Sequence, residues 1–406
     1  MKTAVIGGGA AGLFLAVCLS EMFNKDKNNK QQMQITVFEK SNKVLSKLEI
    51  SGGGRCNCTN TFEFAKDLSL VYPRGFRLMK KLFNVFSPQD AFSWFESHGV
   101  KLKTEDNGRV FPVTDNSHTI INMFLHYARK YNINIKTNSP VTSLNEVKDF
   151  DFIALTCGGL LHAGHNGIFK ELNINIVEPV ASLFAMKTED KELNKLAGIT
   201  LSDVMIMIPK TKIKSWGNLL ITHQGITGPC VLQMSSYAAR LLKECNYKTN
   251  LLVNWVNMKD SQVLQALKEC IISNPERIIA NCNNFSLPQR FWEYILCKVM
   301  PNRTDIRYKD LTKKETNRIV NVLCNDIITL NGRNTHKEEF VTCGGVALEC
   351  INHSNMSLKE HNRIFLAGEV TDTDGITGGY NFQAAWTTAF IAAQGIYNTC
   401  QSGSVQ

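Results

Sequence analysis

The sequence predicts an α/β fold in which one parallel-sheet domain is built from both ends of the chain and interrupted by a large insertion. Near each end, at 2–23 and 363–391, a short apolar strand is followed by a glycine-rich turn and an apolar helix. The middle of the chain instead alternates apolar and polar residues and then shows helical periodicity. With 406 residues, the chain is long enough for two or three domains.

The glycine-rich turn near the N-terminus has the G-x-G-x-x-G spacing of a phosphate-binding turn. Lys2–Ile6 is expected to form a buried strand, and the turn follows it at once. Gly7 permits a tight turn, Gly9 lets the backbone approach a diphosphate, and Gly12 allows close helix–strand packing. The free N–H groups of the helix N-terminus favour the diphosphate charge. The predicted cofactor contacts in this Rossmann-like turn are Gly7, Gly9, Ala10, Ala11 and Gly12.

A second apolar strand, Ile35–Phe38, ends on Glu39. An acidic side chain at this point accepts hydrogen bonds from the adenosine ribose hydroxyls and repels a 2′-phosphate, which disfavours NADP here. Glu39 lies further along the chain than the usual spacing of about 20 residues, and a polar loop insertion at 25–32 explains the excess. Glu39 and the adjacent Lys40 are therefore predicted cofactor contacts.

The C-terminal part supplies a second half of the same site. Arg363–Ala367 is expected to form a buried strand that ends on Gly368 and Glu369, and Gly378–Gln383 opens an apolar helix. In flavoproteins with two dinucleotide-binding folds, the acidic residue binds the ribityl chain and the helix N-terminus faces the flavin pyrimidine oxygen. The alternative is a glycine-capped core helix. The predicted FAD contacts are Gly368, Glu369, Gly379, Tyr380, Asn381 and Phe382.

Three further segments are expected to approach the cofactor. Ser51–Asn60 contains three successive glycines, so its backbone turns sharply or passes close to a ligand, although a flexible loop is the alternative. A buried strand at 152–157 ends in glycines, as does the strand near adenine and diphosphate in such proteins. Val141 is a candidate for the backbone that contacts adenine. The cofactor contacts predicted here are Gly54, Arg55, Cys56, Asn57, Val141 and Gly158.

The insertion is predicted to combine strands with helices. Alternating residues indicate strands at 204–208 and 219–221. Three helical patterns follow: one after Asp260, one with Ser286 as cap and Pro288 in its first turn, and one opened by the capping box 312–315. The predicted domains are an FAD-binding domain at 1–187 and 340–406, an inserted β-rich domain at 188–256 and 328–339, and a helical module at 257–327. The insertion is expected to close over the flavin.

The catalytic candidates are His223, Arg55 and Tyr380. His223 lies in Thr222–Pro229, before a predicted helix that Thr227 could cap, where it could exchange protons, bind an anionic substrate, or simply hold the loop. Hydride transfer needs only residues that position substrate on the flavin. Arg55 and Tyr380 are candidates for polarising donors near the ring, or for cofactor contacts only.

Composition limits the partners and the compartment. The net charge of +9 is scattered along the chain, so no stable nucleic-acid partner is expected. Thirteen cysteines in a chain this long indicate a reducing compartment, and the pair Cys56 and Cys58 lacks a redox-motif spacer. No apolar run reaches membrane-span length. We therefore expect a cytoplasmic protein with no membrane partner and no metal; its oligomeric state is not indicated.

Taken together, these segments resemble the flavoprotein family that includes aminoacetone oxidase and the BaiN- and YhiN-like NAD(P)/FAD-dependent oxidoreductases. The resemblance covers nearly the whole chain and implies a dinucleotide-binding domain interrupted by a large insertion. Relatives usually carry a Ser-Thr-Gly-Asp-Gly-Tyr run where this chain has Gly164–Ile168, so contacts near the diphosphate or active-site entrance do not carry over there. The matching stretches are 7–12, 50–60, 108–112, 222–229, 341–346 and 367–383.

The function predicted is that of an FAD-dependent oxidoreductase. It would transfer a hydride between a nicotinamide cofactor or oxygen and a small organic substrate, such as a conjugated alkene or an amine. No second G-x-G-x-x-G occurs in the insertion, so NADH or NADPH is expected to dock only transiently. The alternatives are a flavin-dependent RNA-modifying enzyme, for which the sequence shows no basic face with interleaved aromatics, and a non-catalytic FAD-binding redox protein.

Overall fold

The computed structural model describes residues 1–26, 32–162, 166–334 and 341–402. The chain divides into two compact units, one made of 1–180 and 341–406 and the other of 181–340. The first unit thus draws on both ends of the chain. The second is a continuous insertion. Each unit is described by itself below.

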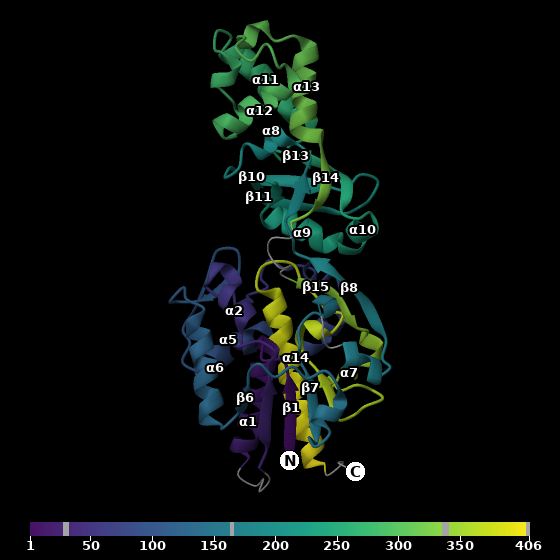
Figure 1. Cartoon of the computed structure of the whole chain (residues 1–406). Coiled ribbons are helices and arrows are strands. Elements are labelled where there is room, and N and C mark those ends of the chain that lie inside the picture. Colours follow the sequence, from purple (N-terminus) through teal and green to yellow (C-terminus); the bar gives the residue numbers. More distant parts are fainter. Residues whose placement is uncertain (27–31, 163–165, 335–340, 403–406) are drawn as a thin grey trace. The chain divides into compact units, whose positions relative to one another are not determined.

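The first unit is built on a five-stranded parallel sheet with the order β16-β7-β1-β2-β6 (Figure 1). Because the strands are parallel, the turns that follow them all leave from one edge of the sheet. This places the segments that begin at Gly7, Glu39, Thr156 and Ala367 side by side, although they lie far apart in the sequence. The strands are β1 (Lys2–Ile6), β2 (Gln34–Phe38), β6 (Asn134–Lys136), β7 (Phe152–Leu155) and β16 (Ile364–Leu366).

Two helices from opposite ends of the chain pack against each other beside this sheet. They are α1 (Ala10–Lys25) and α14 (Tyr380–Gln401), and α6 (His118–Lys130) also packs on α1. Residues 11–21 of α1 are all buried, which explains why the sequence of this helix is apolar on every side. The indole of Trp386 in α14 lies 5.2 Å from the ring of Phe14 in α1. Aromatic packing therefore joins the two predicted halves of the site.

Smaller elements complete the first unit. The three-stranded sheet β3-β5-β4 and the pair β15-β8 lie outside the main sheet. Their bounds are β3 (Thr59–Asn60), β4 (Leu102–Thr104), β5 (Arg109–Pro112), β8 (Ile176–Ser182) and β15 (Val341–Val346), and the remaining helices are α2 (Ser46–Ile50), α3 (Leu68–Val71), α4 (Phe76–Leu82), α5 (Pro88–Ser97) and α7 (Asn166–Glu171).

A buried ion pair holds the far end of α1. Nε2 of His98 lies 2.5 Å from Oε1 of Glu21, and Nδ1 lies 2.6 Å from the carbonyl oxygen of Trp94. The carboxylate of Glu21 and the carbonyl of Trp94 thus hold the imidazole ring from both of its nitrogens. The side chains of His98 and Glu21 are only 8% and 9% exposed. Burial alone raises the pKa of Glu21, but His98, Lys25 and Tyr131 lower it overall.

Glu21→Gln is expected to lower the free energy of unfolding by about 1–3 kcal/mol at neutral pH, because the buried ring of His98 loses its carboxylate partner. The folded-state pKa of Glu21 is lowered, so its contribution is present above the unfolded value of about 4.3 and disappears as the pH falls through the folded value. Denaturant unfolding as a function of pH measures this. The difference from wild type should shrink below about pH 4; a constant difference would contradict the assignment. Glu96→Gln, on the exposed side of α5, is the matched control.

The second unit contains a closed six-stranded antiparallel barrel with the order β10-β11-β12-β9-β14-β13. The helices α11 (Asp260–Ser273), α12 (Gln289–Val299) and α13 (Lys313–Asn325) are inserted between β13 and β14 (Figure 1). The strands are β9 (Met186–Thr188), β10 (Thr200–Met207), β11 (Lys214–Thr222), β12 (Gly225–Thr227), β13 (Lys248–Asn254) and β14 (Asp326–Arg333), and the shorter helices are α8 (Lys191–Asn194), α9 (Pro229–Tyr237) and α10 (Ala239–Glu244).

The helix caps of this unit confirm one prediction and correct another. Thr312 and Glu315 form the predicted capping box of α13. Ser286 is not the cap of α12, because the helix begins one residue after Pro288. The side chain of Asn283 accepts hydrogen bonds from the backbone of Phe285 and Leu287, and Ser286 lies inside this turn at φ 53°. In the described ranges, none of the helices is both long enough and apolar enough to span a membrane.

Candidate functional site

The three glycines of the first turn have different surroundings. A Cβ on Gly7, whose φ is +114°, would lie 2.4 Å from the carbonyl oxygen of Thr156, and one on Gly12 would lie 2.0 Å from the carbonyl oxygen of Gly7. These two positions pack the turn and the helix tightly onto the strands. A Cβ on Gly9 would meet nothing within 4 Å. Gly9 thus borders open space at the point where the sequence predicts the diphosphate.

That open space lies at the N-terminus of α1. Gly9 is the N-cap and offers no side chain to the first-turn N–H groups, and no acidic residue lies in the first turn. A helix start left in this state is a site for an anion, because its N–H groups and dipole both favour negative charge. The residues therefore fit the diphosphate of FAD, held by the backbone of Ala10, Ala11 and Gly12.

Glu39 lies beside the same turn. One of its carboxylate oxygens accepts from the N–H of Gly8 at 2.9 Å and the other from Ser41 at 2.8 Å. Glu39 thus braces the glycine turn from the end of β2. Each carboxylate oxygen can accept further hydrogen bonds, so the contact with ribose hydroxyls stays a prediction.

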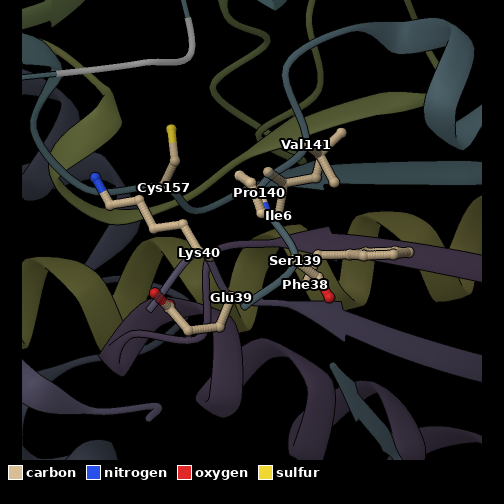
Figure 2. A pocket seen from close by; sticks show the side chains of 9 residues that line it. Ile6, Phe38, Glu39, Lys40, Ser139, Pro140, Val141 and Cys157 are labelled. Carbon is tan, nitrogen blue, oxygen red and sulfur yellow. The ribbon is translucent and has the colours of Figure 1, made fainter. Parts of the chain in front are cut away.

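Glu39 also lines a small pocket together with Lys40, Val141 and Cys157 (Figure 2). The remaining lining residues are Ile6, Gly7, Phe38, Ser139 and Pro140. The pocket volume is about 30 Å³, close to the space of one water molecule. An adenosine therefore has to lie along its mouth or widen it. Val141 and Cys157 line this pocket together with Glu39, and the contact of Val141 with adenine stays a prediction.

Glu369 connects three segments at the sheet edge. Its carboxylate accepts from Nζ of Lys47 at 3.0 Å and from the backbone N–H of Thr342 at 2.7 Å. A Cβ on Gly158 would lie 3.8 Å from Oε2 of Glu369. Gly368 precedes it at φ +77°, and a Cβ there would come within 2.9 Å of the Cβ of Ala11. Glu369 and Gly158 thus lie near each other, at the start of α1, as the predicted site requires.

The segment 56–60 docks onto the N-terminus of α14. The side-chain amide of Asn57 is oriented so that its oxygen accepts from the N–H of Gly379 and its nitrogen donates to the carbonyl of Thr59, both at 3.0 Å. Asn60 donates to the carbonyl of Gly378 at 3.0 Å, and the indole N–H of Trp386 donates to the carbonyl of Cys58 at 2.7 Å. The two glycine-rich segments predicted from distant parts of the sequence therefore form one structure. The side chain of Asn57 is occupied by this role.

In the first turn of α14, the side chains of Asn381 and Phe382 are engaged within the chain, so these two positions offer a ligand their backbone. Gly379 caps the helix at φ +92° without a side-chain bond. Asn381 exchanges two hydrogen bonds of 2.8 Å with the backbone of Gly375, and the ring of Phe382 stacks on Trp386. The first N–H groups of a helix have no partner within it. They can face the flavin pyrimidine, as the sequence predicts for this helix.

Tyr380 is buried among aromatic rings. Its ring centroid lies 5.0 Å from that of Phe62 and 6.4 Å from that of Tyr72. Burial raises the pKa of Tyr380, so the phenol keeps its proton at neutral pH. Its role as a polarising donor stays a prediction, and the structure supplies the protonated state that this role needs.

A clamp that sequence reasoning missed holds the loop before α14. Arg74 makes a two-pronged ion pair with Asp374, whose side chain is fully buried, and the contact between Nε and Oδ1 measures 2.6 Å. Beside it, Ile376 donates to the carbonyl of Val71 at 2.9 Å, and the hydroxyl of Tyr72 donates to the carbonyl of Tyr380 at 2.8 Å. No signal in the sequence indicated this pair, because its two residues lie 300 positions apart and only the fold brings them together.

Arg55 has partners of its own. Its guanidinium donates to Glu105 at 2.7 Å, lies 3.6 Å from Asp115, and stacks 4.0 Å above the ring of Phe111. The side chain is 38% exposed. Gly53 and Gly54 next to it border open space, since a Cβ on either would meet nothing within 4 Å. The backbone here fits a close approach to the cofactor, whereas a direct role of the Arg55 side chain stays a prediction.

His223 belongs to the second unit. It lies exposed in the turn between β11 and β12, with Thr222 bonded to Gly225 across the turn. The prediction that Thr227 caps the next helix is wrong: Thr227 ends β12, and Gly228 is the N-cap of α9 at φ +100°, with Pro229 in the first turn as expected. The proton-transfer role of His223 stays a prediction.

The thiols near the site are held in the unreactive, protonated form. Burial raises the pKa of Cys56 to about 12, raises that of Cys157 to about 12, and raises that of Cys58. Cys56 and Cys58 are both free and buried. The chain has no cluster of three possible metal ligands within the ranges that the structure describes. Gly164 and His165 of the segment that departs from the family pattern lie outside those ranges.

Comparisons with known proteins concern the chain as a whole. A family model described as "HI0933-like protein Rossmann domain" matches residues 1–395. Two curated proteins named ribosomal RNA dihydrouridine synthase are similar: that of Escherichia coli is 25% identical, with 96% of each chain covered, and that of Haemophilus influenzae is 26% identical, with 97% of this chain and 98% of the other covered. A 3-dehydro-bile acid delta(4,6)-reductase of Clostridium scindens is 23% identical, with 97% and 98% covered.

Among solved structures, a match is found to 3-ketosteroid delta1-dehydrogenase from Sterolibacterium denitrificans, in complex with 1,4-androstadiene-3,17-dione. The TM-score is 0.47 and the identity 10%, with 98% of this chain and 99% of the other covered.

Proposed function

The chain belongs to the HI0933-like Rossmann-domain family of FAD-dependent oxidoreductases, and from this premise we propose that it reduces a carbon–carbon double bond conjugated to a carbonyl group. What supports the proposal is the chemistry shared by the relatives' names. Dihydrouridine arises when the C5=C6 bond of uracil, conjugated to the C4 carbonyl, is reduced. A delta(4,6)-reductase of a 3-dehydro-bile acid removes double bonds conjugated to the C3 ketone. Steroid and nucleobase differ in every other respect.

The reaction adds two electrons and two protons across the double bond, in the form of one hydride and one proton. FAD held at this site and reduced by transiently docked NADH or NADPH would supply the hydride chemistry. The β-carbon of the substrate gains the hydride and the α-carbon gains a proton. On the protein side, the first N–H groups of α14 would stabilise the negative charge of a reduced pyrimidine, and Glu369 with Lys47 would orient the ribityl region. The Tyr380 hydroxyl, which keeps its proton at neutral pH, is the candidate that polarises the carbonyl or protonates the α-carbon.

Anaerobic mixing tests this function. The purified holoenzyme should lose its flavin absorbance with NADH or NADPH and regain it when an enone is added, with a product two hydrogens heavier by mass spectrometry. If the reduced flavin is reoxidised only by oxygen, and an amine rather than NAD(P)H reduces it, the protein is an oxidase and the proposal is wrong. If neither NADH nor NADPH reduces the flavin and no enone reoxidises it, the result favours a non-catalytic FAD-binding redox protein.

Tyr380→Phe is expected to retain FAD and to slow the oxidative half-reaction with the enone by about 10²-fold, because it removes one proton donor. The reductive half-reaction with NAD(P)H should change little. Stopped-flow absorbance separates the two steps. Tyr72→Phe is the matched control within the same aromatic cluster, since its hydroxyl only donates to the carbonyl of Tyr380. Equal slowing of both half-reactions in Tyr380→Phe indicates a cofactor contact instead.

The second candidate function is reduction of uridine within RNA. Two relatives carry that name over almost their whole length, and the charge of this chain is unevenly distributed. Residues 181–340 hold 22 lysines and arginines against 15 acidic residues, whereas the rest of the chain holds 23 against 21. Most of the net positive charge is therefore in the inserted unit. Mass spectrometry of RNA nucleosides after incubation with the reduced enzyme detects dihydrouridine directly.

A further inference from the structure

Four neighbouring strands of the barrel carry apolar side chains on their outer face. Trp216 on β11 is 56% exposed and Ile327 on β14 is 58% exposed. Between them, Met205 and Met207 of β10 and Leu252 of β13 are half-buried. The strand register places Trp216 opposite Met205, Met207 opposite Leu252, and Leu252 opposite Ile327. These five residues form a continuous band across the strands, which we call the tryptophan band.

Three lysines border the tryptophan band at the β10–β11 hairpin. Lys210, Lys212 and Lys214 are all exposed, and the structure shows no carboxylate within 4.0 Å of any of them among the residues it describes. Lys214 lies opposite Met207 and two residues before Trp216, so it shares the face of the indole. The hairpin is held by hydrogen bonds of 3.2 Å from Thr211 to the carbonyl of Ile208 and of 3.1 Å between Ile208 and Ile213. An ordered turn thus presents three positive charges that no carboxylate in the described part of the chain neutralises.

Other lysines and arginines of the same unit are paired. Arg303 contacts Glu315, Lys298 contacts Asp326, and both Arg307 and Lys309 contact Glu276. Within the ranges that the structure describes, the three hairpin lysines differ from these pairs in having no acidic partner, and they lie next to an exposed indole. Surface charge alone is ordinary for a soluble domain. The juxtaposition of unneutralised lysines with an open aromatic ring is what indicates a ligand.

We propose that the hairpin lysines and the tryptophan band bind single-stranded RNA, a proposal that rests on the second candidate function. Lysine ammonium groups bind backbone phosphates, and an exposed aromatic ring stacks on any unpaired base. A double helix hides the faces of its bases, so Trp216 selects for single strands and loops. The positive excess of residues 181–340 adds a sequence-independent attraction for a polyanion. RNA bound at this face is held by the barrel, independently of the flavin.

The sequence did not reveal this face for a geometric reason. The lysines and Trp216 lie in 210–216, but their apolar neighbours come from 205–207, 252 and 327, which only the barrel register brings together. Along the chain, each residue of the tryptophan band lies next to a buried one. The expectation that no basic face with interleaved aromatics exists was drawn without this register.

Fluorescence anisotropy of the full-length holoenzyme with a labelled single-stranded RNA of about 16 nucleotides tests the proposal. Trp216→Ala should weaken binding about tenfold, and Trp216→Phe should restore most of it, because a phenyl ring also stacks. The salt dependence of binding is the second readout. Each lost phosphate contact lowers the magnitude of the slope of log K against log salt by about 0.7, so the triple variant K210Q/K212Q/K214Q should lower it by about 2.

A matched triple variant controls for net charge. K243Q/K268Q/K313Q removes the same three charges from exposed positions on α10, α11 and α13, and it should leave the RNA affinity within about twofold of wild type and the slope nearly unchanged. If the two triple variants lose the same affinity, RNA binding is diffuse and the assigned face is wrong. Binding of duplex RNA equal to that of single strands, or unaffected by Trp216→Ala, also overturns it.

Other partners give different results. Vesicles rich in phosphatidylglycerol that bind the wild type but not the triple variant, while RNA does not bind, identify a membrane face instead. Failure of the proposed function is distinguishable, because flavin reduction by NAD(P)H and reoxidation by a small enone are measured without RNA. A protein that reduces enones but binds no RNA retains the first proposal and loses this one. A protein that binds RNA through Trp216 but reduces no enone retains the RNA-binding proposal and loses the enone-reduction proposal.

Discussion

Gly9→Ala is expected to fold like wild type and to lose most of its FAD. Its φ of −80° suits alanine, and the new methyl group would meet no atom of the chain within 4 Å. That space is where the diphosphate has to approach the first N–H groups of α1, so the methyl group takes the place of the ligand. We expect FAD to bind at least about a hundredfold more weakly, near 2.7 kcal/mol. Flavin absorbance after gel filtration and titration of the apoprotein with FAD measure the loss.

Gly12→Ala, in the same turn, is the informative comparison. Its methyl group would lie 2.0 Å from the carbonyl oxygen of Gly7 and 2.8 Å from Oγ1 of Thr156. The backbone has to shift, so we expect a loss of about 1–3 kcal/mol in the free energy of unfolding, occasionally more, even without cofactor. Gly9→Ala should therefore be stable but colourless, whereas Gly12→Ala should be unstable. If Gly9→Ala retains FAD with wild-type affinity, the assigned diphosphate site is wrong.

Arg74→Ala is expected to destabilise the first unit by about 3–5 kcal/mol and to release FAD. Removing the guanidinium leaves the carboxylate of Asp374 without its two-pronged partner in a fully buried position. Burial raises the pKa of Asp374 in spite of Arg74, which shows how much its ionised form depends on that partner. The loop 371–379 then loses the clamp that places the start of α14. Denaturant unfolding and FAD retention are the measurements.

Two further variants test whether the pair, rather than the arginine alone, matters. Replacing both partners, as R74M/D374L, should be less damaging than Arg74→Ala, because no buried charge is left over. Arg74→Lys should recover only part of the stability, since an ammonium group cannot make the two-pronged contact. Arg77→Ala, on the exposed side of α4, is the control and should change the stability by less than about 0.5 kcal/mol. Equal destabilisation by both alanine variants would argue against a special role of the clamp.

The sequence was informative wherever function depends on local spacing. The glycines of the first turn, the strands that end on Glu39 and Glu369, and the glycine pair before α14 were predicted because each has a fixed distance along the chain from a strand or helix. The capping box at Thr312 was recognised for the same reason. In all of these, neighbours in space are neighbours in sequence.

Contacts between distant segments could not be predicted in this way. Arg74 and Asp374 are 300 residues apart, and nothing in either segment identifies the other as its partner. The contacts of Arg55 with Glu105 and Asp115 were not predicted either, because both carboxylates come from another part of the chain. The caps assigned to Ser286 and Thr227 failed where a side chain outside the motif, or a glycine with positive φ, set the start of the helix.

The discontinuity of the first unit has a consequence for biosynthesis. After β7 has been synthesised, more than 200 residues follow before β16 and α14 appear, which takes roughly 10–40 seconds at usual elongation rates of about 5–20 residues per second. The barrel and its helices lie within that interval and can fold while the ribosome is still translating. Four of the five strands of the main sheet are made before β16, while Phe14 and the segment 56–60 still lack α14 as a packing partner. The predicted FAD site, which includes Glu369 and the start of α14, is therefore complete only after these last elements have been synthesised.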